Sequence, residues 1–294
     1  MNTIDLQVHS TASDGRHAPE EVVRMAKESG VNTIALTDHD TIKGLEAALR
    51  GGEVEDVKVI PGIEISVEDH GAHILGYGID WKNPELLASL EQSEQDRIKS
   101  AKKTLENLKQ LGFVVEWEDV LRETTGSVIG RPHISRAVLH RPENKAKLGS
   151  ISTVGDFIQS YLLEDSPHYN KRRHTNFSEA IKLIHGAGGV VVWSHPVLHF
   201  RNNYDGLEKF LGELCEMGLD GLEVFTSAHS EDEAEFVQNL AIAKNLLRTA
   251  GSDFHEANSA TAKIGGYETY GFSTEDIMPK LEEAISKRKS ALYT

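Results

Sequence analysis

The chain has 294 residues, 39% of them hydrophobic, and a formal net charge of −15. A chain of this length forms one large domain or a domain with an insertion, and its acidic balance argues against a protein that coats long nucleic acid by bulk electrostatics. Its single cysteine, Cys215, excludes a disulfide within the chain and favours a reducing compartment, so we expect a cytoplasmic protein. The N-terminus leads directly into a strand without a signal-peptide pattern. No apolar run approaches ~20 residues, so no membrane-spanning segment is expected.

The predicted elements alternate between strand and helix along most of the chain. In order, they are a strand from residue 5 that ends in a turn by residue 15, helix 19–29, strand 33–37, a strand region over 57–67, strand 73–79, helix 177–185, strand 190–193, helix 206–217, strand 221–225, helix 232–245 and strand 247–251. Such an alternation implies a parallel sheet. Residues 84–111 predict one long helix by their apolar spacing, and residues 113–174 show short helical pieces without a barrel-like strand.

Polar side chains follow the apolar part of several of these strands. Asp38 and His39 come after the second strand, and His195 comes after strand 190–193. In a parallel α/β barrel, active sites lie at this end of the strands. We therefore expect an α/β barrel formed by residues 1–83 and 175–294, with residues 84–174 inserted as a helical domain.

Two similar patterns lie near the two ends of the chain. In each, polar side chains stand at positions i and i+2, which share a face along a strand. The first pattern is Gln7 and His9, with Asp14 in the turn beyond, and the second is Asp253 and His255. Two such pairs far apart in the sequence favour one site assembled from both ends of a closed barrel.

Together these positions form a set of nitrogen and oxygen donors without a thiolate. The set contains five imidazoles and three carboxylates: His9, Asp14, His39, Glu64, His73, His195, Asp253 and His255. Such donors suit Zn, Mn or Fe. Eight donors exceed what one ion takes, so we expect two or three divalent ions. Sites with several metal ions are used to activate water and to clamp the oxygens of a phosphoryl displacement.

Three further acidic residues have open roles. Asp38 and Asp40 fit either metal ligands or groups that orient an imidazole ligand. For Glu223 we favour a buried supporting group over a ligand.

Eight segments together resemble the PHP (polymerase and histidinol phosphatase) superfamily. They are 5-DLQVHSTASDG-15, 37-TDHDT-41, 61-PGIEIS-66, 73-HILGY-77, 130-GRPHISR-136, 194-SHP-196, 221-GLEVF-225 and 251-GSDFH-255. The similarity is greatest to the branch that contains bacterial 3′,5′-nucleoside bisphosphate phosphatases and a 5′→3′ exoribonuclease. The resemblance covers essentially the whole chain. It implies a distorted (β/α)7, TIM-like barrel with a helical insertion and up to three divalent ions.

The resemblance also implies a ligand set for each ion. The first ion would be bound at positions 7 and 9 with Glu64 and Asp253, the second by Glu64, His73 and His195, and the third by Asp14, His39 and His255. Among these, His195, Asp253 and Glu64 would carry the catalysis. Position 7 departs from the family, because the motif has histidine where this chain has Gln7.

The inserted segment has a charge of its own. Residues 131–174 contain eight Lys/Arg against four Asp/Glu in a chain that is acidic overall. One interpretation is a basic face that is only solvated. The other is a binding site for substrate phosphate, since Arg pairs with phosphate oxygens in bidentate fashion. In the similar enzymes the Gly-Arg-Pro-His segment binds substrate phosphate, which implies Arg131 and His133; Lys171, Arg172 and His229 are further candidates.

The sequence thus predicts a metal-dependent phosphoesterase in which a metal-activated hydroxide attacks phosphorus. The expected substrate is a nucleotide, either a 3′,5′-nucleoside bisphosphate or a short 5′-phosphorylated oligonucleotide. Two alternatives remain open. One is a phosphatase of a small non-nucleotide phosphate such as histidinol phosphate, and the other is a weakened or non-catalytic nucleotide-binding protein, which Gln7 alone suggests.

Overall fold

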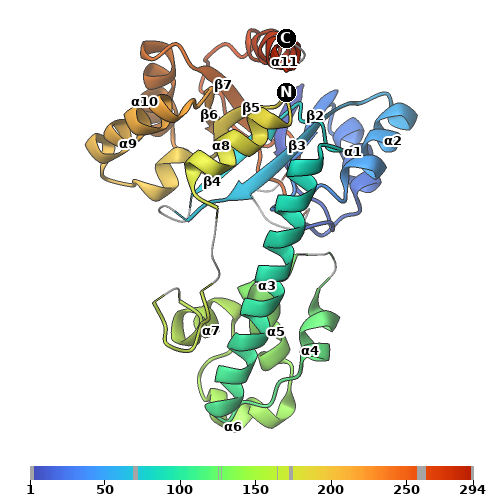
Figure 1. Cartoon of the computed structure of the whole chain (residues 1–294), viewed down its shortest axis with the longest axis vertical. Helices are drawn as coiled ribbons and strands as arrows, with labels where there is room; N and C mark the ends of the chain where they lie inside the picture. The colour runs from blue at the N-terminus through green and yellow to red at the C-terminus, as the bar shows by residue number, and fades with distance from the viewer. Residues whose placement is uncertain are drawn as a thin grey trace. The chain divides into compact units, whose positions relative to one another are not determined.

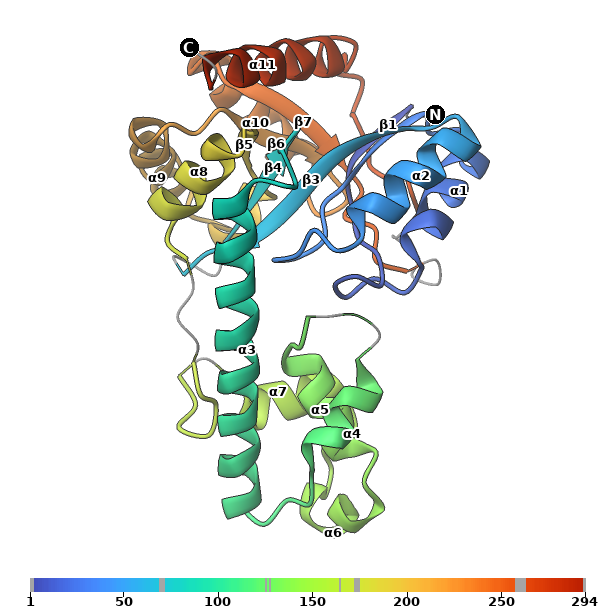
Figure 2. The same cartoon turned by 45° about the vertical axis from the view of Figure 1, so that its right-hand side comes forward.

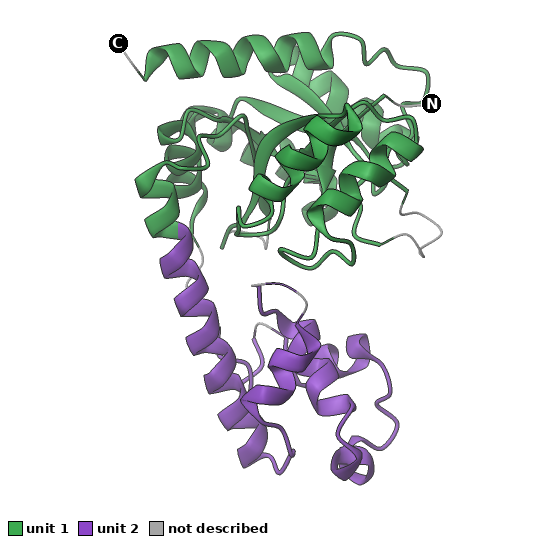
Figure 3. Ribbon diagram, turned by 90° about the vertical axis from the view of Figure 1, so that its right-hand side faces the viewer, with its two compact units in different colours: residues 1–89, 174–294 green, residues 90–173 purple. Residues whose placement is uncertain are grey.

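The computed structural model describes residues 3–68, 72–124, 126, 128–163, 165–171, 175–256 and 263–292. The chain forms two compact units (Figure 3). Unit 1 comprises Met1–Ser89 and His174–Thr294, and unit 2 comprises Leu90–Arg173. The long helix α3 (Pro84–Gln110) begins in unit 1 and continues into unit 2. No helix in the described ranges is both long enough and apolar enough to cross a membrane.

Unit 1 is built around a seven-stranded sheet whose strands follow one another in sequence order (Figure 1). The strands are β1 (Ile4–Val8), β2 (Thr33–Leu36), β3 (Lys58–Ser66), β4 (His73–Tyr77), β5 (Val190–Trp193), β6 (Gly221–Thr226) and β7 (Leu247–Gly251). The first and last strands approach each other, since the His9 amide donates to the Phe254 carbonyl at 2.9 Å and the Asp253 amide to the Gln7 carbonyl at 3.0 Å. The sheet is therefore a nearly closed barrel, which confirms the predicted fold class.

The expectation of a wholly parallel sheet is wrong for one strand. β4 pairs antiparallel with both β3 and β5, whereas β1, β2 and β3 and then β5, β6 and β7 pair in parallel. The physical reason is the connection: only residues 67–72 join β3 to β4, and a parallel crossover needs a dozen residues or more. The start of β4 therefore lies at the same edge of the barrel as the ends of the parallel strands.

Helices cover the outside of the barrel. Those of unit 1 are α1 (Pro19–Glu28), α2 (Leu45–Glu55), α8 (Phe177–Gly186), α9 (Tyr204–Met217), α10 (Glu231–Ala243) and α11 (Ile277–Ala291), with a short 3₁₀ turn, η3 (Pro196–His199), after β5. Helix α1 begins with Pro19 and carries Glu20 and Glu21 in its first turn, which suits the positive end of the helix dipole. The barrel core is densely apolar, and the predicted core strand β5 is buried along its whole length.

The sequence analysis did not predict α2 or α11. Helix α2 contains Gly51 and Gly52, which disfavour a helix. Close packing explains the two glycines. A Cβ at Gly52 would lie 2.6 Å from the Val57 carbonyl, and one at Gly51 would lie 3.3 Å from the α1 backbone.

Helix α11 covers the end of the barrel opposite to the ends of the parallel strands (Figure 2). Arg288 on this helix donates to Asp220, just before β6, at 2.7 Å. Asp220 also accepts from His185 of α8 and from the Val191 amide of β5, each at 2.8 Å. Burial raises the pKa of Asp220, but these partners outweigh it and hold the pKa below its ordinary value. One carboxylate thus ties three elements together.

Unit 2 is helical, as predicted. After α3 it contains α4 (Trp117–Glu123), α5 (Arg131–Leu139), η2 (Pro142–Asn144), α6 (Lys145–Leu148) and α7 (Val154–Tyr161). Its buried core includes an aromatic group in which Phe157 and Tyr161 pack against Phe113, with ring centroids 5.5 and 5.0 Å away. Arg141 donates twice to the buried Asp119, at 2.8 and 2.7 Å. Unit 2 therefore has a core of its own.

Candidate metal centre

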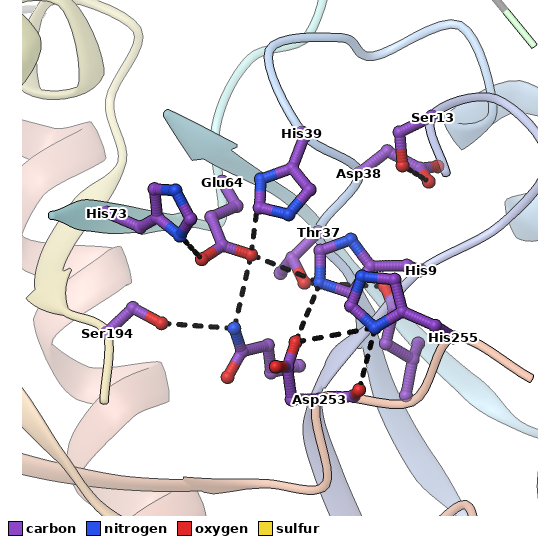
Figure 4. A network of polar contacts seen from close by, with 12 residues as sticks. His9, Ser13, Thr37, Asp38, His39, Glu64, His73, Ser194, Asp253 and His255 are labelled. Atoms are coloured by element: carbon purple, nitrogen blue, oxygen red, sulfur yellow. Dashed lines mark hydrogen bonds and ion pairs between the residues drawn. The ribbon is translucent and has the colours of Figure 1, made fainter. Parts of the chain in front are cut away.

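The barrel brings the predicted polar residues to one edge. His9 comes directly after β1, His39 follows β2, and His73 begins the antiparallel β4. His195 follows β5, while Asp253 and His255 follow β7. Figure 4 shows His9, His39, His73, Asp253 and His255 around the carboxylate of Glu64, which projects from β3. Residues from almost the whole length of the sequence therefore meet in one cluster.

Glu64 is the centre of this cluster. Its side chain is 0% exposed, and its two carboxylate oxygens face different imidazoles. Oε1 lies 2.9 Å from His73 Nδ1 and 3.5 Å from His195 Nε2. Oε2 lies 3.1 Å from His9 Nε2 and 3.7 Å from His39 Nδ1. Glu64 therefore offers one oxygen on the side of His73 and His195 and the other on the side of His9 and His39.

Asp14 is the centre of a second group nearer to solvent. Its side chain is 43% exposed, and its carboxylate lies 3.4 Å from His255 Nε2, 3.9 Å from His9 Nδ1 and 4.0 Å from His39 Nε2. The other ring nitrogen of His255, Nδ1, donates to the Asp253 carbonyl at 2.9 Å. This hydrogen bond fixes the orientation of the ring, so that Nε2 faces Asp14.

Within the described part of the chain, three groups of donor atoms lie within 4.8 Å of one another. They are His9, Asp14, His39 and His255; His39, Glu64 and His73; and His9, Glu64 and Asp253. Several of their buried atoms make no hydrogen bond to the described residues, among them both ring nitrogens of His9 and Glu64 Oε1. Converging buried donors without hydrogen bonds are costly unless something else satisfies them. Their chemistry fits divalent cations.

Two predicted ligands are placed differently from the rest. His195 belongs to none of the three groups found among the described residues, although its Nε2 approaches Glu64. Gln7 is 0% exposed and donates from Nε2 to Glu64 Oε2 at 3.1 Å and to Ser194 Oγ at 3.0 Å. The amide nitrogen of Gln7, rather than its oxygen, therefore faces the carboxylate.

Charges in the cluster shift the pKa values of its members. Burial lowers the pKa of His9, but the Asp253 and Glu64 carboxylates outweigh it and hold that pKa well above its ordinary value. Burial raises the pKa of Glu64, yet the surrounding imidazoles, led by His39 and His73, hold it well below its usual range. For His39, burial dominates and lowers the pKa to about 4. Its ring is therefore neutral at pH 7 and available as a ligand.

Three buried carboxylates support the site without joining the three groups. Asp38 accepts from the Ser10 amide and from the hydroxyls of Ser10 and Ser13, at 2.6 to 2.7 Å, and so holds the loop after His9. Glu223 accepts from the His195 amide at 2.9 Å. Burial raises the pKa of Glu223 well above its ordinary value. Its supporting position agrees with the role that we favoured from the sequence.

The third carboxylate, Asp5, is a supporting residue that the sequence analysis missed. It accepts from the Ser252 amide at 2.8 Å, the Ser252 hydroxyl at 2.5 Å and the Gly265 amide at 2.7 Å. These bonds tie β1 to the segment that carries Asp253. Asp5 and Gln7 follow the same i and i+2 pattern as Gln7 and His9, which was the available signal.

Asp40, which the sequence left open as a ligand or a supporting group, accepts hydrogen bonds from the Ser66 amide and hydroxyl, each at 2.9 Å.

His195 and Asp253 have positive φ values, 29° and 56°. This left-handed backbone is uncommon outside glycine and is found where a functional position demands it.

The predicted phosphate-binding residues have varied surroundings. In unit 2, the Arg131 guanidinium lies 5.7 Å from the Tyr169 ring centroid, and His133 Nδ1 accepts from the Gly130 amide at 3.0 Å. Lys171 also belongs to unit 2, whereas Arg172 lies outside the described residues.

His229 belongs to unit 1 and is 4% exposed. Its Nδ1 donates to the Val224 carbonyl at 2.9 Å, and burial lowers its pKa to about 4. At pH 7 this ring is neutral, so it can accept a hydrogen bond but offers no charge to a phosphate.

Comparison with known proteins agrees with this geometry. The profile of the PHP domain family matches residues 5–226. A 5′-3′ exoribonuclease from Haemophilus influenzae is 31% identical over 255 residues, which cover 85% of this chain and 89% of that protein. A 3′,5′-nucleoside bisphosphate phosphatase from Chromobacterium violaceum is 29% identical over 286 residues, 95% of this chain and 94% of that protein. The structure of an amidohydrolase from Chromobacterium violaceum, with bound sulfate and no metal, matches with a TM-score of 0.81 at 27% identity and covers 96% of this chain and 97% of that one.

Proposed function

Because this chain belongs to the PHP domain family and is a metal-dependent phosphoesterase, we propose that its substrate is a nucleotide with a terminal phosphate. The observation that carries the proposal is the group of imidazoles and carboxylates around Glu64, whose converging donors suit a centre with more than one ion. Two relatives that span most of the chain, the exoribonuclease and the bisphosphate phosphatase, are named for reactions on nucleotide phosphates. Their shared substrate chemistry supports a nucleotide here.

We assign the ion ligands in three sets. His9, Glu64 and Asp253 would hold the first ion with Gln7; Glu64, His73 and His195 the second; and Asp14, His39 and His255 the third. The short distances from Glu64 to both His9 and His73 support its place in the first and the second set. The ions, once bound, would activate water and neutralise charge on phosphoryl oxygens. Mn, Zn and Fe all fit these donors.

The protein's own groups prepare the reaction. Asp253 pairs with His9 at 3.2 Å and is 30% exposed, whereas Glu64 is buried. Burial raises the pKa of Asp253, but His9 outweighs it and keeps the pKa below its ordinary value. Asp253 is therefore ionised at pH 7 and is the carboxylate that can accept a hydrogen bond from a water molecule entering from solvent. Glu223 and the His195 amide keep the backbone of His195 in its left-handed conformation.

A substrate panel tests the proposed function. The purified enzyme with Mn²⁺ is given adenosine 3′,5′-bisphosphate, 5′-phosphorylated RNA and histidinol phosphate. We expect turnover of the bisphosphate or the RNA and none of histidinol phosphate. Turnover of histidinol phosphate alone would support the non-nucleotide alternative, and nucleotide binding without turnover under excess Mn²⁺ would support a non-catalytic binder.

We also propose that the Arg131 guanidinium binds a substrate phosphate, with His133, Lys171 and Arg172 as further candidates. The support is the basic character of residues 131–174. Arg131→Ala should lower kcat/KM for the bisphosphate by about 10- to 150-fold, since a hydrogen bond to a charged group contributes about 1.5–3 kcal/mol. The loss should be small for a substrate with one phosphate.

Arg122→Ala is the matched control, because it removes an equal charge from a side chain of unit 2 that is 66% exposed. Equal losses on both substrates in the Arg131 variant would assign Arg131 to the reacting phosphate or to stability.

A further inference from the structure

Gln7 is the one neutral amide among the candidate ligands, and its surroundings are unusual. It is fully buried, and its amide nitrogen donates hydrogen bonds to Glu64 Oε2 and Ser194 Oγ. Its carbonyl oxygen Oε1 is also buried and has no hydrogen-bond partner among the described residues. A buried amide usually satisfies both of its ends. In Gln7 the amide nitrogen donates two hydrogen bonds, whereas the carbonyl oxygen accepts none from the described residues.

The orientation of this amide conflicts with metal binding. Glu64 Oε2 also lies 3.1 Å from His9 Nε2, so it is the oxygen directed towards the first candidate site. The NH₂ group of Gln7 approaches that same oxygen, and an N–H donor is repelled by a cation. In the orientation observed, Gln7 contributes no ligand atom and its nitrogen competes with an ion for Glu64.

A half-turn of the amide removes the conflict. It exchanges Nε2 and Oε1, so that Oε1 would lie near Glu64 Oε2 and near the Ser194 hydroxyl. A hydroxyl can donate as well as accept, so Ser194 can stay bonded to either end of the amide. Two oxygens facing each other at about this distance repel unless a cation lies between them. Of the two orientations, only the reversed one offers a cation an oxygen from each of Gln7 and Glu64.

The ligand atom that results has its own preference among metals. A carbonyl oxygen suits Mg²⁺ and Mn²⁺, whereas an imidazole nitrogen suits Zn²⁺. The other ligands of the first site, His9, Glu64 and Asp253, do not change between these cases. Position 7 can therefore shift the balance between metals at this one site.

We propose that Gln7 determines metal preference at the first site: its amide reverses when an ion binds, and its carbonyl oxygen favours Mn²⁺ over Zn²⁺. This inference rests on the proposed metal centre. It also predicts weak binding at this site, because the amide must first give up its hydrogen bond to Glu64.

The test compares metal affinities by competition dialysis and elemental analysis. Gln7→His should raise the affinity ratio of Zn²⁺ to Mn²⁺ for one ion per chain by about 10- to 100-fold, the effect on metal affinity that is found even for residues that only support a ligand. Gln7→Glu keeps an oxygen donor and the same shape, so it should strengthen the binding of both metals without moving the ratio towards Zn²⁺. His73→Gln is the matched control, since it makes the reverse exchange on the other side of Glu64 and should lower the ratio.

A second measurement follows the amide itself. With glutamine side chains labelled with ¹⁵N, the NH₂ signal of Gln7 is identified by its absence in Gln7→Glu. We expect this signal to move when diamagnetic Mg²⁺ is added. An unchanged signal at saturating metal, or an unchanged Zn²⁺/Mn²⁺ ratio in Gln7→His, would overturn the inference.

The metal centre and the role of Gln7 can be tested separately. If Glu64→Gln loses two ions per chain while the Gln7 variants behave like the natural chain, the metal centre stands and the role of Gln7 is wrong. If the natural chain binds no divalent metal, the proposed centre itself fails.

Discussion

The sharpest test of the centre is to compare Glu64→Gln with Asp14→Asn. Both changes replace a carboxylate by an amide of the same shape. Glu64 belongs to two of the three donor groups and Asp14 to one. We therefore expect Glu64→Gln to lose two ions per chain and Asp14→Asn to lose one, as measured by elemental analysis after equilibration with Mn²⁺.

Thermal stability is an independent measure of how many ions each variant has lost. At a free metal concentration of 100 times Kd, each ion stabilises the fold by ~2.7 kcal/mol. For a domain of this size, that raises Tm by about 5–10 °C. The comparison must use the rise in Tm on adding metal to each variant, because removing the partner of a buried ion pair by itself costs about 3–5 kcal/mol.

Either of two results would contradict the assignment of two ions to Glu64. One is a Glu64→Gln protein that keeps as much metal as Asp14→Asn. The other is a Glu64→Gln protein whose Tm rises with Mn²⁺ as much as that of the natural chain.

Three further predictions concern catalysis and stability. His195→Ala and Asp253→Ala should abolish turnover and leave the circular dichroism spectrum unchanged; undiminished activity in either would remove that residue from the site. Asp220→Asn should lower the free energy of unfolding in urea by about 1.5–3 kcal/mol, whereas Glu282→Gln, at an exposed ion pair, should cost less than ~1 kcal/mol. Folding lowers the pKa of Asp220 below its ordinary value of 3.8. The ionised side chain therefore contributes its full stabilisation above pH 3.8, and this stabilisation is lost as the pH falls through the lower pKa of the folded state. The difference in unfolding free energy between the natural chain and Asp220→Asn should therefore shrink in acid. Phe157→Ala should destabilise unit 2 by about 3–5 kcal/mol and leave the metal content unchanged, since all candidate ligands belong to unit 1; a fall in metal content would contradict this.

The barrel and most of the site could be predicted because both follow from short-range patterns. The strands are apolar and short, helices separate most of them, and polar residues come just after the strands. His39, His195 and Asp253 were recognisable from that position alone. Once strands run in parallel, their ends meet at one edge, so residues distant in sequence become neighbours without further information.

Part of what was missed depended on local features and part on contacts between distant segments. The direction of β4 follows from a connection too short for a crossover helix, a local signal that was not used, and strand β3 was predicted only as a strand region because Pro61 and Gly62 interrupt its pattern. Helix α2 exists in spite of Gly51 and Gly52, because these glycines allow close packing. The sequence offered no signal for the atom that Gln7 directs towards Glu64, since either end of an amide fits the same side chain.

The centre also shows how the fold holds a costly arrangement together. The cluster contains buried ring nitrogens without hydrogen bonds and two non-glycine residues in left-handed backbone. The surrounding carboxylates offset this cost: Asp5 joins β1 to the segment after β7, Asp38 fixes the loop after β1, and Glu223 holds the backbone at His195. None of the three belongs to a donor group found among the described residues. Supporting acids of this kind let the candidate ligand atoms converge on one another, because the loops that carry them are anchored by other hydrogen bonds. Bound ions would then contribute folding free energy as well as chemistry, which is why metal content and Tm should change together in the Glu64 and Asp14 variants.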